Sequence, residues 1–401
     1  MPRKKINIIT PHFAPENTAA SHRMECTAKV LSASFEVNVF TLTEKGNKVV
    51  RSTELWSDNL TVHYLDLPNY PKNNFILRAF FEWWYSRKLV KFSNQVEADV
   101  VLFTTPFMFL INAVANYSTA KRKIADVRDL VWHYLPERNY IQKKIKNKFS
   151  KDIHQALQNF DAITVTNSVE RKWLIDNAKI ESTKIKLIPN GISEDKLRFL
   201  QTIRYSKPQK DFIISYIGNI GSAQAFLPLI DAIKNKVGVK LNLIGDGSRR
   251  SDIQKYLLEE DIRNVYMPGK LRWARIIPYY QSSSILFASL QPEYNTAVPS
   301  KMYEYLATGL PIIFLGKGAT VELLNNFDNV FHTQDYSSAA IGNEIAEIRF
   351  QKPANSLTNT ITVGENFTRE KLSIRFVELI AGLLNEKIPG SVFVEDVLSE
   401  K

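Results

Sequence analysis

Lys301 and Glu304 have residue types and a spacing suited to binding a ligand that carries both phosphate and hydroxyl groups. They lie in the segment 298–313 (VPSKMYEYLATGLPII), three residues apart, so a helix would place them on one face. A carboxylate accepts hydrogen bonds from hydroxyl groups, and an ammonium neutralises a phosphate. The pattern predicts that both face outward while Met302 and Tyr305 turn inward. An ordinary surface ion pair fits the local pattern as well.

The residues that bound this predicted helix also favour a phosphate. Pro299 and Ser300 suit a helix start, where unpaired N–H groups and a partial positive charge attract anions. Gly309 and Pro311 end the helix before the strand-like run 312–315. We therefore expect a nucleotide to bind at this end of the helix.

Length and composition limit the class of protein. A chain of 401 residues with 44% hydrophobic residues can bury about two cores of ordinary domain size. One cysteine, Cys26, rules out an intramolecular disulfide and indicates a reducing, cytoplasmic compartment. The apolar run 101–117 is interrupted and shorter than the roughly 20 residues of a bilayer span, so we expect no membrane-spanning segment.

The positive charge is concentrated in the first half of the chain. Residues 1–190 contain 28 Lys and Arg against 18 Asp and Glu, whereas the remainder contains 24 against 23. An excess of this kind predicts an anionic partner, such as a phospholipid surface or a pyrophosphate-bearing acceptor. Nucleic acid is not expected as a partner, because we find no nucleic-acid-binding motif.

The first half begins with a strand, helix and strand, predicted at 6–10, 21–34 and 37–42. The loop 11–18 after the first strand contains no glycine, which argues against a dinucleotide-binding dehydrogenase.

The stretch 69–92 mixes aromatic and basic side chains. Such a mixture is typical of a membrane interface, where rings lie at headgroup level and cations meet lipid phosphate. A core helix is the alternative, although aromatics cover nearly every side of this one. The residues expected to contact the acceptor or membrane are Arg23 from the first helix and, from this stretch, Arg78, Trp83, Trp84, Arg87 and Lys88.

Asp129 follows a predicted strand at 123–127, so its carboxylate is expected at the ligand-binding edge of a parallel sheet. It is the candidate for a group near the reacting centre. A carboxylate that caps the following turn or pairs with Arg128 is the alternative.

Glycine-bearing loops follow the predicted strands of the second half, where backbone N–H groups can approach a phosphate. The residues expected to bind the donor are Gly218, Asn219, Gly221, Gly245, Gly269, Lys270, Ser300, Lys301 and Glu304.

Four motifs in order carry a family resemblance: Pro189-Asn190-Gly191, the Gly218–Gly221 loop, Gly245-Asp246-Gly247 and Pro-Ser-Lys-x-x-Glu at 299–304. Together with the run EYLATGLP (304–311), they resemble the retaining, twin-Rossmann (GT-B) glycosyltransferases of family four. The segment from Arg128 to Trp132 resembles relatives that build bacterial surface polysaccharides.

The resemblance implies an α/β fold with two Rossmann-like domains facing across a cleft. An acceptor-binding domain is expected at 1–198, joined by a C-terminal helix at about 367–385. A nucleotide-sugar-binding domain is expected at 205–366, and a tail at 389–401. The polar and basic segment 193–210, which contains Pro208, is interpreted as the linker between the domains.

The resemblance also implies transfer of a hexosyl or N-acetylhexosaminyl group, with retention, from a nucleoside diphosphate sugar, UDP foremost. The implied acceptor is a lipid-linked saccharide of surface-polysaccharide or O-antigen biosynthesis, at the inner face of the cell membrane. Asp129 and Lys301 would act at the reaction, Glu304 would hold the ribose, and no metal or other cofactor is expected.

The chain departs from the family pattern at three places: the first loop lacks the usual Gly pair near Thr18 to Ala20, Thr296 replaces a glutamate, and Gln224 stands near a usual lysine. Two alternatives remain open: a nucleotide-sugar 2-epimerase of the same fold, and a non-catalytic membrane-associated partner of an assembly complex.

Overall fold

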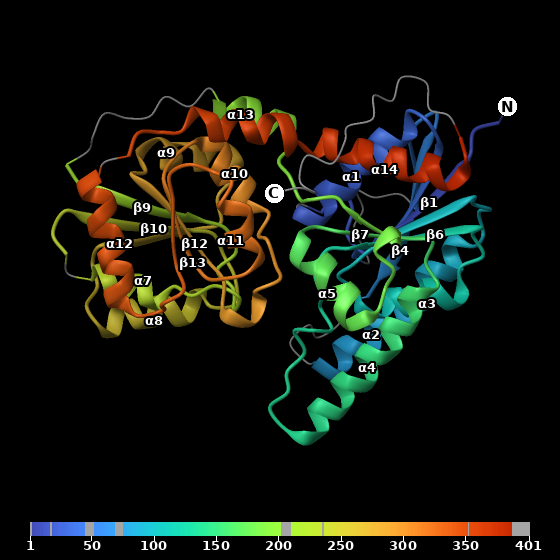
Figure 1. Ribbon diagram of the computed structural model, residues 1–401, viewed down its shortest axis with the longest axis horizontal. Helices are drawn as coiled ribbons and strands as arrows, with labels where there is room; N and C mark the ends of the chain where they lie inside the picture. Colours follow the sequence, from blue (N-terminus) through green and yellow to red (C-terminus); the bar gives the residue numbers. More distant parts are fainter. Residues whose placement is uncertain are drawn as a thin grey trace. The chain divides into compact units, whose positions relative to one another are not determined.

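The chain folds into two compact units, each built on a mostly parallel sheet (Figure 1). The computed structural model describes residues 2–16, 18–44, 52–68, 75–201, 210–234, 236–351 and 353–386. Unit 1 comprises Met1–Thr166, Arg171–Ile188 and Arg369–Lys401, and unit 2 comprises Asn167–Glu170 and Pro189–Thr368.

Unit 1 contains an eight-stranded sheet in the order β3-β4-β2-β1-β5-β6-β7-β8, with only β3 antiparallel. Its strands are β1 (Lys5–Ile9), β2 (Glu36–Glu44), β3 (Thr53–Ser57), β4 (Leu60–Leu67), β5 (Val100–Thr104), β6 (Arg122–Val127), β7 (Ala162–Val165) and β8 (Ile185–Leu187). The central strands are buried along their length because helices cover both faces of the sheet, as parallel sheets require.

Two helices cover one face of this sheet: α1 (Ala19–Ser32) packs against α14 (Arg369–Leu384). Figure 1 shows the other face covered by α2 (Phe75–Ser93), α3 (Met108–Tyr117) and α4 (Tyr140–Gln158). There α3 lies between α2 and α4 and contacts both. The remaining helices of the unit are α5 (Ser168–Ala178), whose first turn belongs to unit 2, and the short η1 (Ser182–Lys184).

Unit 2 contains a six-stranded parallel sheet in the order β11-β10-β9-β12-β13-β14. Its strands are β9 (Phe212–Ile217), β10 (Val239–Ile244), β11 (Val265–Gly269), β12 (Ile285–Ser289), β13 (Ile312–Leu315) and β14 (Val330–Thr333). Its helices are α6 (Glu194–Gln201), α7 (Leu227–Ile233), α8 (Arg250–Glu259), α9 (Trp273–Ser282), η2 (Pro292–Tyr294), α10 (Lys301–Thr308), α11 (Ala319–Leu324), α12 (Ser338–Gln351) and α13 (Leu357–Asn366). The predicted α/β class with two Rossmann-like units is confirmed.

The segment 193–210, which reads as a linker in the sequence, begins with a helix instead. Leu197 and Leu200 of α6 are buried, and α6 packs against α10 and α13. The main segment of unit 2 therefore begins at Pro189, earlier than the boundary predicted between 198 and 205. Residues 202–209 and the predicted tail at 389–401 lie outside the described part of the chain.

Candidate functional site

Helix α10 is fixed against the end of β9 by a buried tyrosine. The Tyr305 hydroxyl accepts a hydrogen bond from the Ile217 N–H at 2.7 Å and donates one to the Ile217 carbonyl at 3.3 Å. At the other end of the helix, Gly309 adopts φ +69°, where a Cβ would lie 2.5 Å from the Ser356 carbonyl oxygen, so only glycine fits. These contacts set the position of Glu304, one residue before Tyr305.

Glu304 lies between two lysines. Its Oε2 accepts from Lys301 Nζ at 2.6 Å, and its Oε1 accepts from Lys196 Nζ at 3.1 Å. The glutamate is only 5% exposed, whereas the two lysine side chains keep 32% and 27% of their exposure. A buried carboxylate of this kind is stable only when it is paired and hydrogen-bonded.

The two ammonium groups determine the charge state of the carboxylate. Burial alone would raise the pKa of Glu304, but the attraction of Lys301 and Lys196 outweighs it and holds that pKa below its ordinary value. The Trp273 ring faces both ammonium groups, with Lys196 Nζ 4.8 Å and Lys301 Nζ 6.0 Å from its centroid. Glu304 is therefore an ionised hydrogen-bond acceptor beside two cations.

The structure corrects one prediction about this pair and adds a residue that was not identified from the sequence. Glu304 does not face outward, because α6 covers that side of α10 and nearly every residue of α10 is buried. Lys196 was missed, because it stands 108 residues before Glu304 in a segment interpreted as linker. Leu197 and Leu200, apolar three residues apart among charged residues, were the signal that a helix begins there.

The ends of three neighbouring strands meet beside α10. The Gly218 N–H donates to the Ile244 carbonyl at 2.9 Å, and the Gly245 N–H donates to the Gly269 carbonyl at 3.0 Å. Gly245 has φ +149°, and a Cβ there would lie 1.8 Å from the Gly218 carbonyl oxygen, so no side chain fits. The predicted glycines of β9, β10 and β11 thus form one backbone-lined edge, at which the N–H groups of Gly218 and Gly245 already donate to neighbouring carbonyls instead of being free for a phosphate.

The remaining predicted donor residues lie around this edge. The Gly221 N–H donates to Gln224 Oε1 at 3.0 Å, so Gln224 engages an amide of the loop. Asn219 and Lys270 are exposed, and Ser300 is the N-cap residue of α10, although its side chain makes no capping bond.

Thr296, which replaces the family's first glutamate, is buried in unit 2. It is 3% exposed, and its carbonyl accepts a hydrogen bond from Asn167 Nδ2 at 2.9 Å. Glu293, the nearest carboxylate in sequence, is exposed in η2. Thr296 itself therefore supplies no carboxylate at the position of that glutamate.

Asp129 belongs to unit 1, in the loop after β6. The loop is anchored by the Arg128 N–H, which donates to Thr105 Oγ1 at 3.0 Å. Burial raises the pKa of Asp129 to about 6, against the opposing attraction of Arg128. A carboxyl group with a pKa near neutral is suited to proton transfer.

Arg23 does not have the exposed position expected of an acceptor or membrane contact. It is 6% exposed and pairs with the fully buried Asp126, Nη2 to Oδ1 at 3.0 Å, while Thr104 and Thr164 hydroxyls donate to the same carboxylate. Burial would raise the pKa of Asp126, but Arg23 more than compensates and lowers it. Arg23 therefore stabilises the interior of unit 1.

Helix α2 packs one face into unit 1 and exposes another. Tyr85, Leu89 and Val90 are buried, whereas Phe80 and Trp84 are 54% and 46% exposed. The predicted cations line the exposed side: the Arg87 guanidinium lies 4.2 Å from the Trp83 ring centroid, Lys88 Nζ lies 5.7 Å from that of Trp84, and Arg78 pairs with Glu82. Residues 69–74 and the side chains of Phe75 and Ile76 lie outside the described part.

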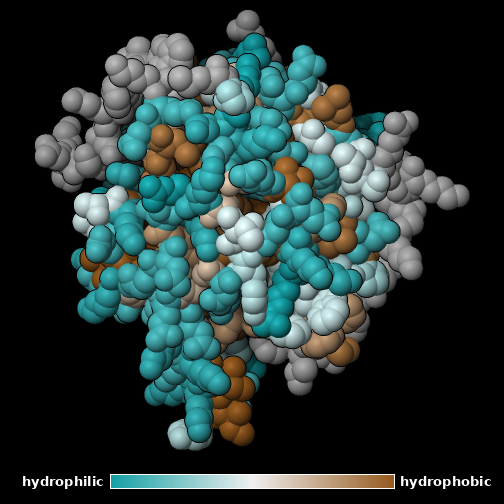
Figure 2. Space-filling model, turned by 90° about the vertical axis from the view of Figure 1, so that its right-hand side faces the viewer, coloured by the Kyte–Doolittle hydropathy of each residue, from teal (hydrophilic) through white to brown (hydrophobic). Residues whose placement is uncertain are grey.

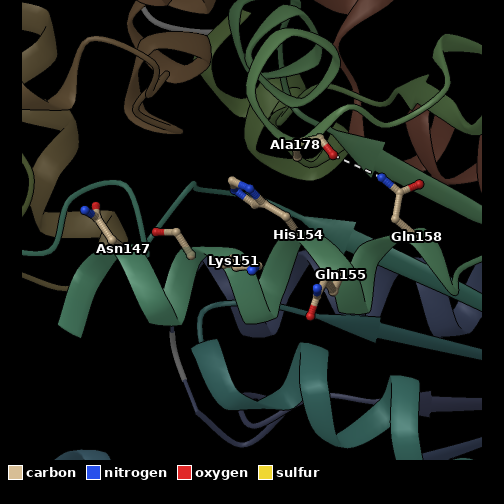
Figure 3. A pocket seen from close by; sticks show the side chains of 7 residues that line it. Asn147, Lys151, His154, Gln155, Gln158 and Ala178 are labelled. Carbon is tan, nitrogen blue, oxygen red and sulfur yellow. Dashed lines mark hydrogen bonds between the residues drawn. The ribbon is translucent and has the colours of Figure 1, made fainter. Parts of the chain in front are cut away.

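A separate hollow of about 370 Å³ lies along α4 in unit 1 (Figure 3). Asn147, Lys151 and His154 project from the helix around it, and the Gln158 amide donates to the Ala178 carbonyl at 3.0 Å. None of the residues predicted to bind donor or acceptor lines it, so it is not part of the candidate site.

Two protein-family models match successive parts of the chain. Residues 200–359 match the model Glycosyl transferases group 1, and residues 23–196 match Glycosyltransferase Family 4. The chain therefore belongs to the GT-B type glycosyltransferases, with a Family 4 domain followed by a group 1 domain.

Similar proteins support the fold. An uncharacterized glycosyltransferase of Methanocaldococcus jannaschii is 24% identical over 230 residues, which are 54% of this chain and 63% of that protein. Sucrose-phosphate synthase from Thermosynechococcus elongatus has a TM-score of 0.73 at 16% identity, over 96% of this chain and 100% of that one. HepE of Anabaena, in complex with UDP, has a TM-score of 0.67 at 15% identity, over 94% and 100%. These matches do not favour the epimerase alternative.

Replacing Glu304 with glutamine tests its role as an acceptor of hydrogen bonds from ribose. We expect donor affinity to fall roughly ten- to hundredfold, because charge-assisted bonds are worth on the order of 1.5–3 kcal/mol. Calorimetric titration with nucleoside diphosphate sugars measures the loss, with Glu259→Gln on the exposed face of α8 as control. Unchanged donor affinity in a folded variant would show that Glu304 does not bind the donor.

Replacing Lys196 with methionine tests whether it holds Glu304 ionised. Without that cation the pKa of Glu304 rises, so donor binding by Lys196→Met should weaken as the pH falls from about 7 to 5. Lys196→Arg should restore the wild-type profile, and Lys255→Met, at an exposed position of α8, should leave it unchanged. Identical pH profiles for wild type and Lys196→Met would contradict the assignment.

Asp129→Asn should change how stability depends on pH. The folded chain keeps the Asp129 proton to a pKa of about 6, above the ordinary 3.8, so wild-type stability should decrease as pH rises between these values. The variant should lose this decrease, which amounts to about 2–3 kcal/mol between pH 4 and 7, and be more stable than wild type at pH 7. Thermal unfolding at pH 4.5 and 7, with Asp152→Asn as control, measures it. Parallel profiles would show that Asp129 titrates normally.

Proposed function

We propose that the protein transfers a sugar from a nucleoside diphosphate sugar, bound by unit 2, to a lipid-linked saccharide bound by unit 1. The observation that carries this proposal is the ionised, buried Glu304, clamped by Lys301 and Lys196 next to a backbone-lined edge of glycines. A carboxylate suits ribose hydroxyls, ammonium groups suit a diphosphate, and glycines without side chains let a ligand approach the backbone closely. The UDP complex of HepE supports UDP as the nucleotide.

The reaction would proceed with retention, as in the family that the motifs resemble. The charge on the leaving diphosphate grows as the sugar bond breaks, and preorganised cations and dipoles stabilise that charge. Lys301 is suited to this role because its ammonium is tied to Glu304 and partly exposed. A departing phosphate oxygen can take the proton of the acceptor hydroxyl, so we propose that no metal or other cofactor is required.

The acceptor side of the proposal rests on the exposed aromatic and basic face of α2. Amphipathic rings with flanking cations favour the headgroup region of an anionic membrane. Among the described residues no helix has the length and apolar content to cross a bilayer. We therefore propose that the protein is peripheral at the inner face of the cell membrane. There it would transfer a hexosyl or N-acetylhexosaminyl group in surface-polysaccharide or O-antigen assembly.

A transfer assay tests this function. Purified protein should transfer label from one of a panel of UDP- and GDP-sugars to a short-chain polyprenyl-diphosphate saccharide, and the anomeric configuration of the product should match that of the donor. Lys301→Met should lower turnover by about two orders of magnitude. Donor epimerisation without transfer, or no donor binding at all, would contradict the proposal.

A further inference from the structure

The first half of α4 contains no buried residue, although its Lys146 side chain is largely covered, being 13% exposed, and pairs with Glu137 of the preceding loop. The buried residues of this helix, Ile153, Ala156 and Leu157, all lie in its last two turns. Phe149 marks the edge of the packed part, with its ring 5.2 Å from that of Phe109 in α3. Figure 1 shows the lower end of α4 running beyond α2 and α3 of the same unit. We name residues 139–148 the α4 prong.

The helical start of the prong is encoded locally. Asn139 is its N-cap and accepts a hydrogen bond from the Gln142 N–H at 2.9 Å. Gln142 Oε1 accepts in turn from the Arg138 N–H at 2.9 Å, which satisfies a second free donor. The sequence therefore specifies where the helix begins, and the packed second half of α4 supports the first half.

An apolar stripe runs along the prong into the core. Ile141, Ile145, Phe149 and Ile153 are spaced four residues apart, so they form one stripe. Its inner half is packed, whereas Ile141 is 68% and Ile145 60% exposed. The hydrophobic patch at the lower end of Figure 2 lies at the height of this tip in Figure 1. The outer half of the stripe thus has the chemistry of a buried surface but no cover.

The charge around the stripe identifies what covers it. Residues 137–152 contain six Lys and Arg against two acidic residues, Glu137 and Asp152, and Glu137 pairs with Lys146. Lys144 and Lys148 follow Ile141 and Ile145 by three residues, so each lies beside an isoleucine on the helix. Aliphatic side chains flanked by lysines suit the boundary between acyl chains and anionic headgroups. Nucleic acid would match the charge but offers nothing to two isoleucines.

We infer that the α4 prong inserts its isoleucine tip into an anionic lipid bilayer and is a membrane contact in addition to the face of α2. This inference rests on the proposed function, in which the acceptor is lipid-linked. Both helices pack against α3 on one face of the unit 1 sheet. One contact of a few side chains holds a protein weakly, and two contacts multiply their affinities.

Vesicle co-sedimentation tests the prong. Wild type should bind phosphatidylglycerol-containing vesicles, bind pure phosphatidylcholine weakly, and dissociate as salt rises. Ile141→Ser/Ile145→Ser should weaken binding about tenfold or more. Lys143→Gln/Lys144→Gln/Lys148→Gln should weaken it about fivefold for each lysine removed. Leu258→Ser, at a residue of α8 that is 83% exposed, is the matched control and should bind as wild type does.

Two further measurements separate the possible outcomes. Tm and donor titration of the prong variants should equal those of wild type, because the replaced side chains are exposed and lie in unit 1. Full vesicle binding by the serine variant would overturn the inference. Loss of vesicle binding in Trp84→Ser, with full binding in the serine variant of the prong, would also overturn the inference but would leave the proposed function intact. Equal loss of heparin binding and vesicle binding in the lysine variant, with none in the serine variant, would indicate a polyanion instead of a bilayer. Absence of donor binding in wild type would count against the proposed function, not the prong.

Discussion

A carboxylate buried in a protein must be compensated, and the donor side of this protein is arranged around one. Removing an ion from water costs on the order of several kcal/mol, which is recovered only through close partners. Glu304 has two, Lys301 from its own helix and Lys196 from α6. Lys196 reaches Glu304 only because α6 packs on α10. The Lys196–Glu304 pair therefore both joins these two helices and keeps the Glu304 carboxylate ionised.

Unit 1 contains a second buried carboxylate with a different role. Asp126 accepts hydrogen bonds from the Arg23 guanidinium and from two threonine hydroxyls, and all three partners belong to unit 1. Asp129, three residues further along, has a raised pKa instead of a lowered one. The difference follows from the partners: Asp126 is paired with a cation, whereas burial dominates at Asp129. Of the two, Asp129 is suited to exchange a proton.

The sequence predicts those features that depend on local patterns. Buried strands, the helix ended by Gly309 and the glycines after β9, β10 and β11 follow from periodicity and turn chemistry. Features that depend on distant packing could not be predicted. The pairing of Arg23 with Asp126 joins residues 103 positions apart, and only the fold brings Lys196 to Glu304. Arg23 was assigned to a surface because an arginine after a loop carries no local sign of burial.

Glu304, held ionised by two lysines, should bind the ribose of a nucleotide-sugar, and a crystal structure of the protein with a bound UDP-sugar tests this directly. We expect ribose oxygens about 2.5–2.7 Å from the Glu304 carboxylate and the diphosphate near Lys301 and the Gly218 loop. A nucleotide bound elsewhere, with both lysines still on Glu304 and no ribose contact, would contradict it.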